Sequence, residues 1–523
     1  MPVRSPHPDV EIPEVSLEEF LFGRDLGADL DLPAFVDGIT GAALTHRELH
    51  AQVLRIAAAL AQRGIGRGDV VALFAPNSPA WAAVFHGVLR ANATVTTVNT
   101  LYTAGEAAGQ LVDSRARLIV TTAALLERAQ AAAKEAGIDD VVVLDGADGR
   151  PSLDDLLACP ADPPAPTAGP DDLAVLPYSS GTSGRPKGVM LTHRNLVANL
   201  QQIAAFSTLQ AGMRALAVLP FFHIYGMTSI LNQGIDRRAT VVTLPRFELA
   251  EFLRVIAEYR VQRVLAVPPI LVALAKHPLV DSYDLSSVEL VFSGAAPLDA
   301  GICATLARRL GCRVAQGYGM TEMSPASHFI PDDRIEFDVG SVGPLVPNME
   351  AMVVDPATGA ELPPGERGEL WCRGPNVMVG YLNDPDSTAA TVDADGWLHT
   401  GDLVTVDADG MFTVVDRLKE LIKYKGWSVA PAELEAVLLA HGRIADAAVI
   451  GVRDADGEEV PKAFVVPRPG ADLTAAEVTA FVAERVAPYK KVRMVEFIDA
   501  IPKSAAGKIL RKDLRAREAG EQR

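Results

Sequence analysis

The chain has 523 residues, of which 49% are hydrophobic and 22% charged, and its formal net charge is −18. These proportions are typical of a globular protein, and the length exceeds what one hydrophobic core usually supports, so several packed subdomains are expected. The negative charge argues against nucleic acid as a partner, because phosphate backbones are bound by basic surfaces. It leaves room for an anionic small ligand, whose binding depends on local charge.

The four cysteines, Cys159, Cys303, Cys312 and Cys372, show no CxxC spacing, so neither a disulfide framework nor a zinc site is expected. The N-terminal segment MPVRSPHPDVEIPEV is polar and Pro-rich and lacks the apolar centre of a signal peptide. No uninterrupted apolar run of about 18 residues follows it. We therefore expect a soluble cytoplasmic protein without a membrane partner.

Strand-like apolar runs alternate with helix-like segments from residue 44 to about residue 310. The clearest pairs are a strand at 70–74 before a helix at 79–90, and a strand at 241–244 before a helix at 249–259. This alternation predicts mainly parallel sheets covered by helices.

The pattern changes after residue 344. Turn signals within 349–371 favour antiparallel strands. Beyond Arg417 we expect helices at 432–440 and 474–486 and strands at 447–452 and 463–467. The expected fold class is therefore α/β. A large N-terminal domain of βαβ subdomains plus a smaller β subdomain would span 1–417, and a small α+β domain would span 418–523. A ligand is expected in the cleft between them.

The segment 178–188, YSSGTSGRPKG, predicts a loop that binds the phosphates of ATP. Its glycines let backbone N–H groups approach an anion, and its donors are the hydroxyls of Ser179, Ser180, Thr182 and Ser183, the backbone at Gly181 and the amine of Lys187. A buried strand at 173–176 precedes it, and Thr192 is the expected N-cap of the helix that follows.

This loop departs from the Walker A template, because Pro186 replaces the second glycine and Gly188 replaces the magnesium-binding Ser or Thr. A kinase or motor ATPase is therefore a poor interpretation. A flexible surface turn would explain the glycines and serines, but not so many donors beside a lysine.

Five further motifs follow at long range: SGAAPL (293–298), QGYGMTE (316–322), WLHTGD (397–402), DRLKELIKYKG (416–426) and PKSAAGKILR (502–511). With the phosphate loop, they resemble the acyl-adenylate-forming superfamily, which includes acyl-CoA ligases, luciferases and the adenylation domains of peptide synthetases. The resemblance extends from about residue 44 to residue 511. It implies that the small domain is mobile.

The resemblance implies a nucleotide site made of the phosphate loop and seven further residues, Ala295, Gln316, Gly317, Thr321, Asp402, Arg417 and Lys419. Asp402 and Arg417 would hold the ribose, Thr321 the α-phosphate, and Glu322 a Mg²⁺ ion, which prefers oxygen ligands. Without the resemblance, Asp402 would be read as a turn or cap residue and Glu322 as a solvated carboxylate.

The resemblance assigns catalysis to Lys508, in the SAAGK loop of the small domain. A carboxylate that attacks the α-phosphate brings two anions together, and a cation must bridge them. Lys423 matches a lysine near AMP. His223 matches a residue over the carboxylate, although a core histidine is an alternative.

Arg246, Lys425 and Gly426 match positions that contact CoA after the small domain has turned about Lys419. Such a rotation is useful because one half-reaction expels pyrophosphate and the other admits a thiol.

Within the superfamily, the sequences FFHIYGMTS (221–229), GMTEMSPASH (319–328) and YKGWSVAPAELE (424–435) most resemble 4-coumarate–CoA ligases. The acid would then lie in a slot formed by Tyr225, Ser229, Gly294, Gly319, Pro325 and Ala326. The small residues would leave room for a flat aromatic ring.

The sequence departs from the plant enzymes at three places. Phe292 stands where they usually carry a lysine that reaches the phenol hydroxyl, and Ser428 stands where they carry a glutamine. The box GELWCRG (368–374) has Cys372 displaced by one position, and we interpret this cysteine as structural.

The expected function is that of an ATP-dependent carboxylate–CoA ligase, which forms cinnamoyl- or 4-coumaroyl-CoA through acyl-AMP and releases AMP and pyrophosphate. The alternatives are a ligase for medium-chain fatty or other aryl acids, an adenylation enzyme that loads a carrier protein, and a luciferase-type oxygenase. An inactive scaffold is also an alternative, but the chain retains Lys508, Glu322 and the phosphate loop.

The apolar residue Phe292 predicts that cinnamate is accepted alongside 4-coumarate, because no lysine is available at this position to bind a ring hydroxyl. Thioester formation from each acid with Mg-ATP and CoA, followed by absorbance, measures this preference. Turnover of caffeate with none of cinnamate would contradict the prediction.

Overall fold

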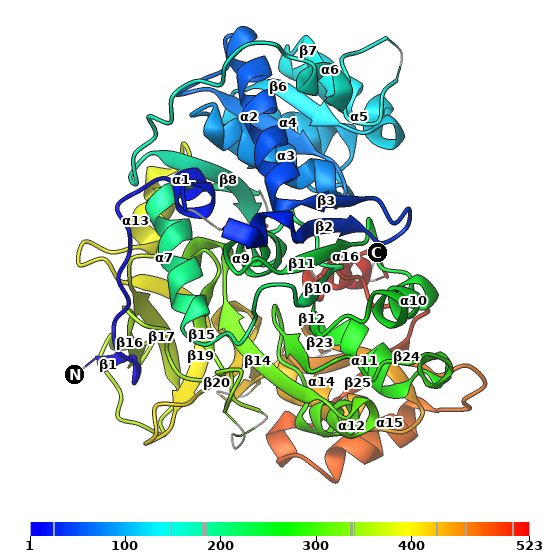
Figure 1. Ribbon diagram of the computed structural model, residues 1–523. Coiled ribbons are helices and arrows are strands. Elements are labelled where there is room, and N and C mark those ends of the chain that lie inside the picture. Colours follow the sequence, from blue (N-terminus) through cyan, green and yellow to red (C-terminus); the bar gives the residue numbers. More distant parts are fainter. Residues whose placement is uncertain are drawn as a thin grey trace.

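The computed structural model describes residues 2–24, 27–147, 149–179, 186–334, 338, 340–424, 427–454, 458–504 and 507–521. Three large sheets lie in the N-terminal part of the chain, and a smaller unit follows them (Figure 1).

The first sheet has seven strands in the order β18-β9-β8-β5-β4-β6-β7. Its strands are β4 (Val70–Phe74), β5 (Thr94–Thr97), β6 (Ala116–Thr121), β7 (Asp140–Val143), β8 (Leu173–Ser179), β9 (Lys187–Thr192) and β18 (Gly380–Tyr381). All neighbours are parallel except at β9, which is antiparallel to both β8 and β18. The flanking helices are α2 (His46–Gln62), α3 (Pro79–Arg90), α4 (Ala104–Ser114) and α5 (Leu126–Ala136). The expected strand 70–74 and helix 79–90 are confirmed residue for residue.

The second sheet has eight strands in the order β15-β14-β13-β12-β10-β11-β2-β3, and only its two edge strands are antiparallel. They are β2 (Pro33–Asp37), β3 (Ala43–Thr45), β10 (Arg214–Ala217), β11 (Thr240–Thr243), β12 (Arg263–Ala266), β13 (Leu290–Ser293), β14 (Arg313–Gly319) and β15 (Ala326–Phe329). The associated helices include α7 (His193–Ala204), α10 (Leu249–Tyr259), α11 (Pro268–Lys276) and α12 (Ala300–Leu310). The expected cap at Thr192 is confirmed, because its hydroxyl accepts from the N–H of Asn195 at 3.2 Å.

The third sheet is antiparallel, as the pattern after residue 344 predicts. Its order is β1-β16-β17-β19-β20, with β1 (Val3–Arg4), β16 (Glu350–Val354), β17 (Gly368–Arg373), β19 (Leu398–Val406) and β20 (Phe412–Arg417). Strand β1 was not predicted from the sequence. It pairs with β16 through Val3 opposite Ala351 and lies beside it in Figure 1.

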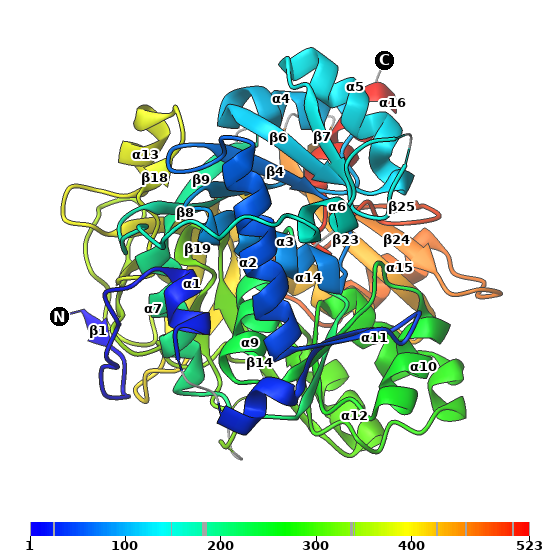
Figure 2. The same ribbon diagram turned by 45° about the horizontal axis from the view of Figure 1, so that its top comes forward.

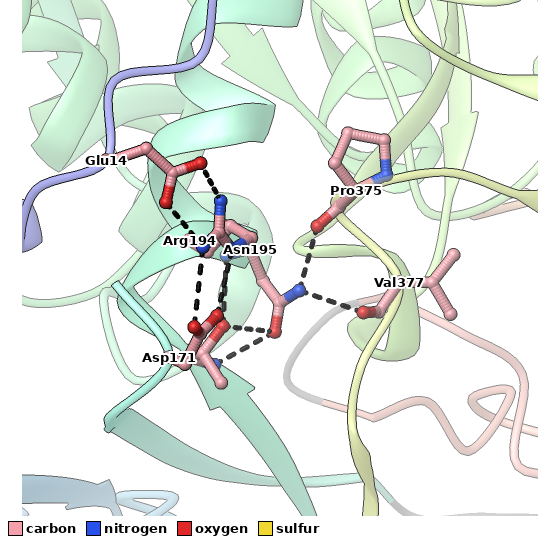
Figure 3. A network of polar contacts seen from close by, with 7 residues as sticks. Glu14, Asp171, Arg194, Asn195, Pro375 and Val377 are labelled. Carbon is pink, nitrogen blue, oxygen red and sulfur yellow. Dashed lines mark hydrogen bonds and ion pairs between the residues drawn. The ribbon is translucent and has the colours of Figure 1, made fainter. Parts of the chain in front are cut away.

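Arg194 and Asn195, at the start of α7, join segments that are far apart in the sequence (Figure 3). Arg194 binds the carboxylates of Glu14 and Asp171, and the amide of Asn195 donates to the carbonyls of Pro375 and Val377 at 2.8 and 2.9 Å. The exposed ion pairs contribute little stability. The hydrogen bonds of the Asn195 amide hold the turn at 374–377, which precedes β18.

The C-terminal unit begins with the hairpin β21 (Ile422–Tyr424) and β22 (Trp427–Val429). It continues with α14 (Pro431–Leu439), a three-stranded sheet of β23 (Ile444–Arg453), β24 (Glu459–Pro467) and β25 (Met494–Phe497), α15 (Ala475–Ala483) and α16 (Arg511–Glu521). Helix α15 ends before the expected residue 486, ahead of Pro488, which disfavours helical backbone in the residue before it. The boundary at 417/418 stays a prediction.

A continuous core joins the first two sheets. Trp81 of α3 is fully buried, with its ring 5.2 Å from that of Phe85 and 5.5 Å from that of Phe221. Figure 2 shows α2 in front of α3, which brings Gly87 of α3 against Ile56 of α2. None of the helices formed by the described residues is both long and apolar enough to cross a membrane.

Replacing Gly87 by alanine should destabilise the protein by about 1–3 kcal/mol, because the new methyl group would lie 2.5 Å from Cγ2 of Ile56 in a packed core. Gly109→Ala is the matched control, since Gly109 lies within α4 with nothing within 4 Å of the added carbon. It should stabilise by roughly 0.5–1 kcal/mol through helix propensity. Urea unfolding measures both changes, and an equal shift in the two variants would contradict the packing argument.

Candidate active site

The site is built on the carboxyl ends of two adjacent parallel strands, β13 and β14, where ligands commonly bind in open α/β sheets. Ala295 follows β13 with a φ of +73°, a left-handed conformation that is strained for alanine. The side chain of Gln316 on β14 holds this turn. Its Oε1 accepts from the N–H of Leu298 at 2.9 Å and its Nε2 donates to the Leu298 carbonyl at 3.2 Å.

Three predicted site residues are glycines because neighbouring groups approach closely. A Cβ at Gly294 would lie 2.8 Å from the Tyr225 ring, and one at Gly317 would lie 2.6 Å from the Phe292 ring. A Cβ at Gly319 would lie 2.0 Å from the carbonyl oxygen of Pro325. Two pairs of the expected acid-slot residues are therefore neighbours, Gly294 with Tyr225 and Gly319 with Pro325.

Phe292 is 4% exposed and stacks on Phe329, with the ring centroids 4.2 Å apart. Its ring covers the place where Gly317 has no side chain. This part of the site is therefore apolar. Ala326 begins β15, the strand that ends in Phe329, and is buried.

Tyr225 and Ser229 lie on one helical segment, which becomes a π-helix over Met227–Asn232. Such turns are frequent at functional sites. His223 caps the segment, and its Nδ1 accepts from the N–H of Tyr225 at 3.3 Å. Burial, with the charge of Lys508, lowers the pKa of His223 to about 4, so its imidazole is neutral at physiological pH.

The phosphate loop is described only at its two ends. Ser179 closes β8 and Lys187 opens β9, whereas residues 180–185 lie outside the described residues, so the roles of Ser180, Gly181, Thr182 and Ser183 stay predictions. The Ser179 hydroxyl donates to Oε1 of Glu322 at 3.1 Å. The Lys187 ammonium contacts Ser387 and lies 3.5 Å from Asp384, at the start of α13 (Pro385–Thr391).

Glu322 is 5% exposed and sits in the 3₁₀ turn Thr321–Met323, directly after β14. Its Oε1 also accepts from the hydroxyl of Tyr381 at 2.9 Å. The described residues include no cluster of three or more His, Cys, Asp or Glu that could hold a metal alone. A single carboxylate fits a Mg²⁺ ion that takes its other oxygen ligands from phosphates and water.

Asp402 on β19 and Arg417 at the end of β20 lie opposite each other in the third sheet. Arg417 Nε is 3.4 Å from Oδ1 of Asp402, and the Tyr318 hydroxyl donates to Oδ2 at 2.6 Å. Burial, and then the charge of Asp402, raises the pKa of Tyr318 well above its usual value. The two predicted ribose ligands are therefore neighbours.

Lys508 approaches this group from the C-terminal unit. The preceding Gly507 has a φ of +74°, and a Cβ there would lie 2.9 Å from Val267, between β12 and α11. Burial lowers the pKa of Lys508 to about 8. The charge of Arg417 lowers it as well, whereas the carboxylates of Asp402 and Glu322 raise it, so Lys508 lies within electrostatic reach of all three.

Arg246, Lys423 and Lys419 are the other predicted residues that the structure describes. Arg246 is exposed in the loop after β11, and Lys423 is exposed on β21, where its N–H donates to Glu459 at 2.7 Å. Lys419 lies in the 3₁₀ turn Leu418–Glu420. Lys425 and Gly426 lie outside the described residues. The roles of all five stay predictions.

Sequence reasoning missed two tyrosines, Tyr318 and Tyr381, which bind the Asp402 and Glu322 carboxylates. Tyr318 lies inside the motif QGYGMTE and could have been singled out as its one phenol. Tyr381 lies outside every motif, and no signal marks it. Burial raises the pKa of Cys372, as expected of a structural thiol.

The AMP-binding enzyme family matches residues 24–382, and the AMP-binding enzyme C-terminal domain matches residues 433–508. The chain is 42% identical to 4-coumarate–CoA ligase 3 of Oryza sativa subsp. japonica over 99% of its own length and 95% of the relative's. The chain therefore belongs to the AMP-binding enzyme family.

Solved structures of similar proteins have the same overall fold. MatB from Rhodopseudomonas palustris with bound ATP is 31% identical, covers 97% of this chain and 99% of its own, and gives a TM-score of 0.88, whereas apo MatB gives 0.78. The anthranilate CoA ligase AuaEII in complex with anthranoyl-AMP gives 0.89 at 27% identity, over 97% of this chain and 98% of its own.

The pKa of Lys508 should respond in opposite directions to its neighbours. Glu322→Gln removes a negative charge and should lower the pKa below about 8, and Arg417→Met removes a positive charge and should raise it. Acetylation of Lys508, followed by mass spectrometry across pH, reports the midpoint because only the neutral amine reacts. Lys503→Met, which removes a cation paired with Asp446, should leave the midpoint unchanged. A midpoint near the ordinary lysine value of 10.5 would contradict the burial of Lys508.

Proposed function

We propose that this protein is an ATP-dependent carboxylate–CoA ligase that forms cinnamoyl- or 4-coumaroyl-CoA through an acyl-AMP intermediate. The single observation that carries this proposal is the position of Lys508. Its ammonium comes from the C-terminal unit and lies within electrostatic reach of Glu322, Asp402 and Arg417. The full-length similarity to 4-coumarate–CoA ligases supports the choice of acid.

In the first half-reaction, the carboxylate of the acid attacks the α-phosphorus of ATP. A new P–O bond forms as the bond to pyrophosphate breaks. The Lys508 ammonium stabilises the negative charge that develops between the two reacting anions. Only the protonated form of Lys508 carries this positive charge, and a pKa of about 8 keeps the lysine mostly protonated at neutral pH.

Other residues orient the nucleotide. Asp402 and Arg417 hold the ribose, and Ala295, Gln316 and Gly317 form the wall for the adenine and AMP phosphate. Thr321 binds the α-phosphate, and the ends of the phosphate loop, Ser179 and Lys187, bind the rest of the chain of phosphates. Glu322 would hold Mg²⁺, which would neutralise charge on the ATP phosphates.

In the second half-reaction, the CoA thiolate attacks the acyl carbonyl carbon, forms the thioester and expels AMP. The small domain turns about Lys419 for this step, and Arg246, Lys425 and Gly426 contact CoA. His223, neutral and beside Tyr225, packs over the carboxylate. The acid's ring lies against the apolar surface formed by Phe292 and Gly317.

Lys508→Met should lower the rate of acyl-AMP formation by about 100- to 1000-fold, because it removes a preorganised cation. The reaction of preformed cinnamoyl-AMP with CoA should be nearly unchanged, since the charge is needed only in the first step. Rapid-quench assays of the two half-reactions with Mg-ATP measure the two rates separately.

Lys503→Met is the matched control, because Lys503 lies in the same motif but pairs with Asp446. It should leave both half-reactions close to normal. Thioester from octanoate but not from the cinnamates would redirect the proposal to a fatty acid ligase. Acyl-AMP without thioester would favour transfer to a carrier protein.

A further inference from the structure

Helix α14 belongs to the packed core of the C-terminal unit but is bonded at both ends by residues that precede this unit in the chain, one on a strand and one on a helix. Its Leu434 and Leu438 are fully buried in a cluster with Val449 and Ala463 of β23 and β24. Its N-cap, Ala430, has no side-chain oxygen that could accept from the first turn. An α-helix leaves its first N–H groups and last carbonyls unpaired, so these ends need partners.

The partner at the N-terminus is Asp416. This residue lies on β20 opposite Leu403 of β19, and is therefore fixed in the third sheet. Its Oδ2 accepts from the N–H of Ala432 at 2.9 Å, and its Oδ1 accepts from the N–H of Arg417 at 2.7 Å. Only 5% of Asp416 is exposed. A carboxylate at this end also matches the positive pole of the helix dipole.

The partner at the C-terminus is Lys276, the last residue of α11. Its Nζ donates to the carbonyl of Leu439, the last residue of α14, at 3.4 Å. Burial and the nearby charge of Arg468 lower the pKa of Lys276, while Asp299 raises it. An ammonium at this end matches the negative pole of the dipole.

We propose that Asp416 and Lys276 are positioning residues that clamp the two ends of α14 and so select the orientation of the small domain in which Lys508 enters the active site. The polarity makes the clamp specific to one orientation, because a reversed helix would meet each charge with the wrong pole. The chain between β20 and β21 contains only the short turn Leu418–Glu420, so the orientation depends on contacts of this kind. The step that admits CoA requires both bonds to break.

The effect on catalysis rests on the proposed function, and it should separate the two half-reactions. Lys276→Met and Asp416→Ala should each slow acyl-AMP formation by about 5- to 30-fold, the range expected for loss of a charge at a partly buried helix end. The reaction of cinnamoyl-AMP with CoA should not slow. Lys276→Arg, which keeps both the charge and a donor, should restore most of the loss, whereas Asp416→Asn, which keeps an acceptor oxygen without the charge, should restore only part of it.

Thr474→Ala is the matched control, because it removes the cap of α15 within the small unit without touching the large sheets. It should lower stability but slow neither half-reaction selectively. Equal slowing of both half-reactions by Lys276→Met and Asp416→Ala, or none in either, would overturn the clamp.

Small-angle X-ray scattering of the protein without substrates tests the clamp independently of the acid. The double variant Lys276→Met/Asp416→Ala should have a larger radius of gyration than the wild type, and Thr474→Ala should not. An unchanged radius would overturn the proposal even if the ligase activity is correct. A larger radius of gyration in the double variant, together with no acyl-AMP formation by the wild-type protein, would support the clamp and contradict the proposed function.

Discussion

One electrostatic arrangement organises this protein. The charge of Lys508 interacts with the charges of Glu322, Asp402 and Arg417, although Lys508 comes from the last motif of the chain and its neighbour Ile509 packs in a separate core. Burying a lysine has a cost, which is visible in its lowered pKa, and the two carboxylates offset part of it. The three sheets hold these carboxylates in position, and the C-terminal unit brings in the Lys508 ammonium.

That support comes from three directions. The carboxyl ends of β13 and β14 in the parallel sheet position Glu322, and the antiparallel sheet places Asp402 opposite Arg417. The β8–β9 hairpin brings Ser179 to Glu322. Tyr318 and Tyr381 donate to the same carboxylates from two different sheets. These hydrogen bonds fix the orientation of both carboxylates in the site.

Close packing surrounds three glycines of the predicted site. Gly294, Gly317 and Gly319 lie where a Cβ would meet Tyr225, Phe292 or the backbone at Pro325. Two aromatic rings and one backbone carbonyl thus take the space that side chains would occupy. The sequence showed that these glycines stand in motifs, but the identity of the group that faces each one could not be read from local spacing.

Local sequence patterns predict the alternation of strands and helices, the motifs of the nucleotide site and the change to antiparallel strands after residue 344. These are local properties, set by hydrophobic period, turn residues and caps such as Thr192. Three features appear only in the tertiary structure. They are the pairing of β1 with β16, the hydrogen bonds from two tyrosines to the site carboxylates, and the hydrogen bonds of Asp416 and Lys276 to the two ends of α14. Such contacts join residues far apart in the chain, and their energies depend on packing and charge in three dimensions, which no local pattern encodes.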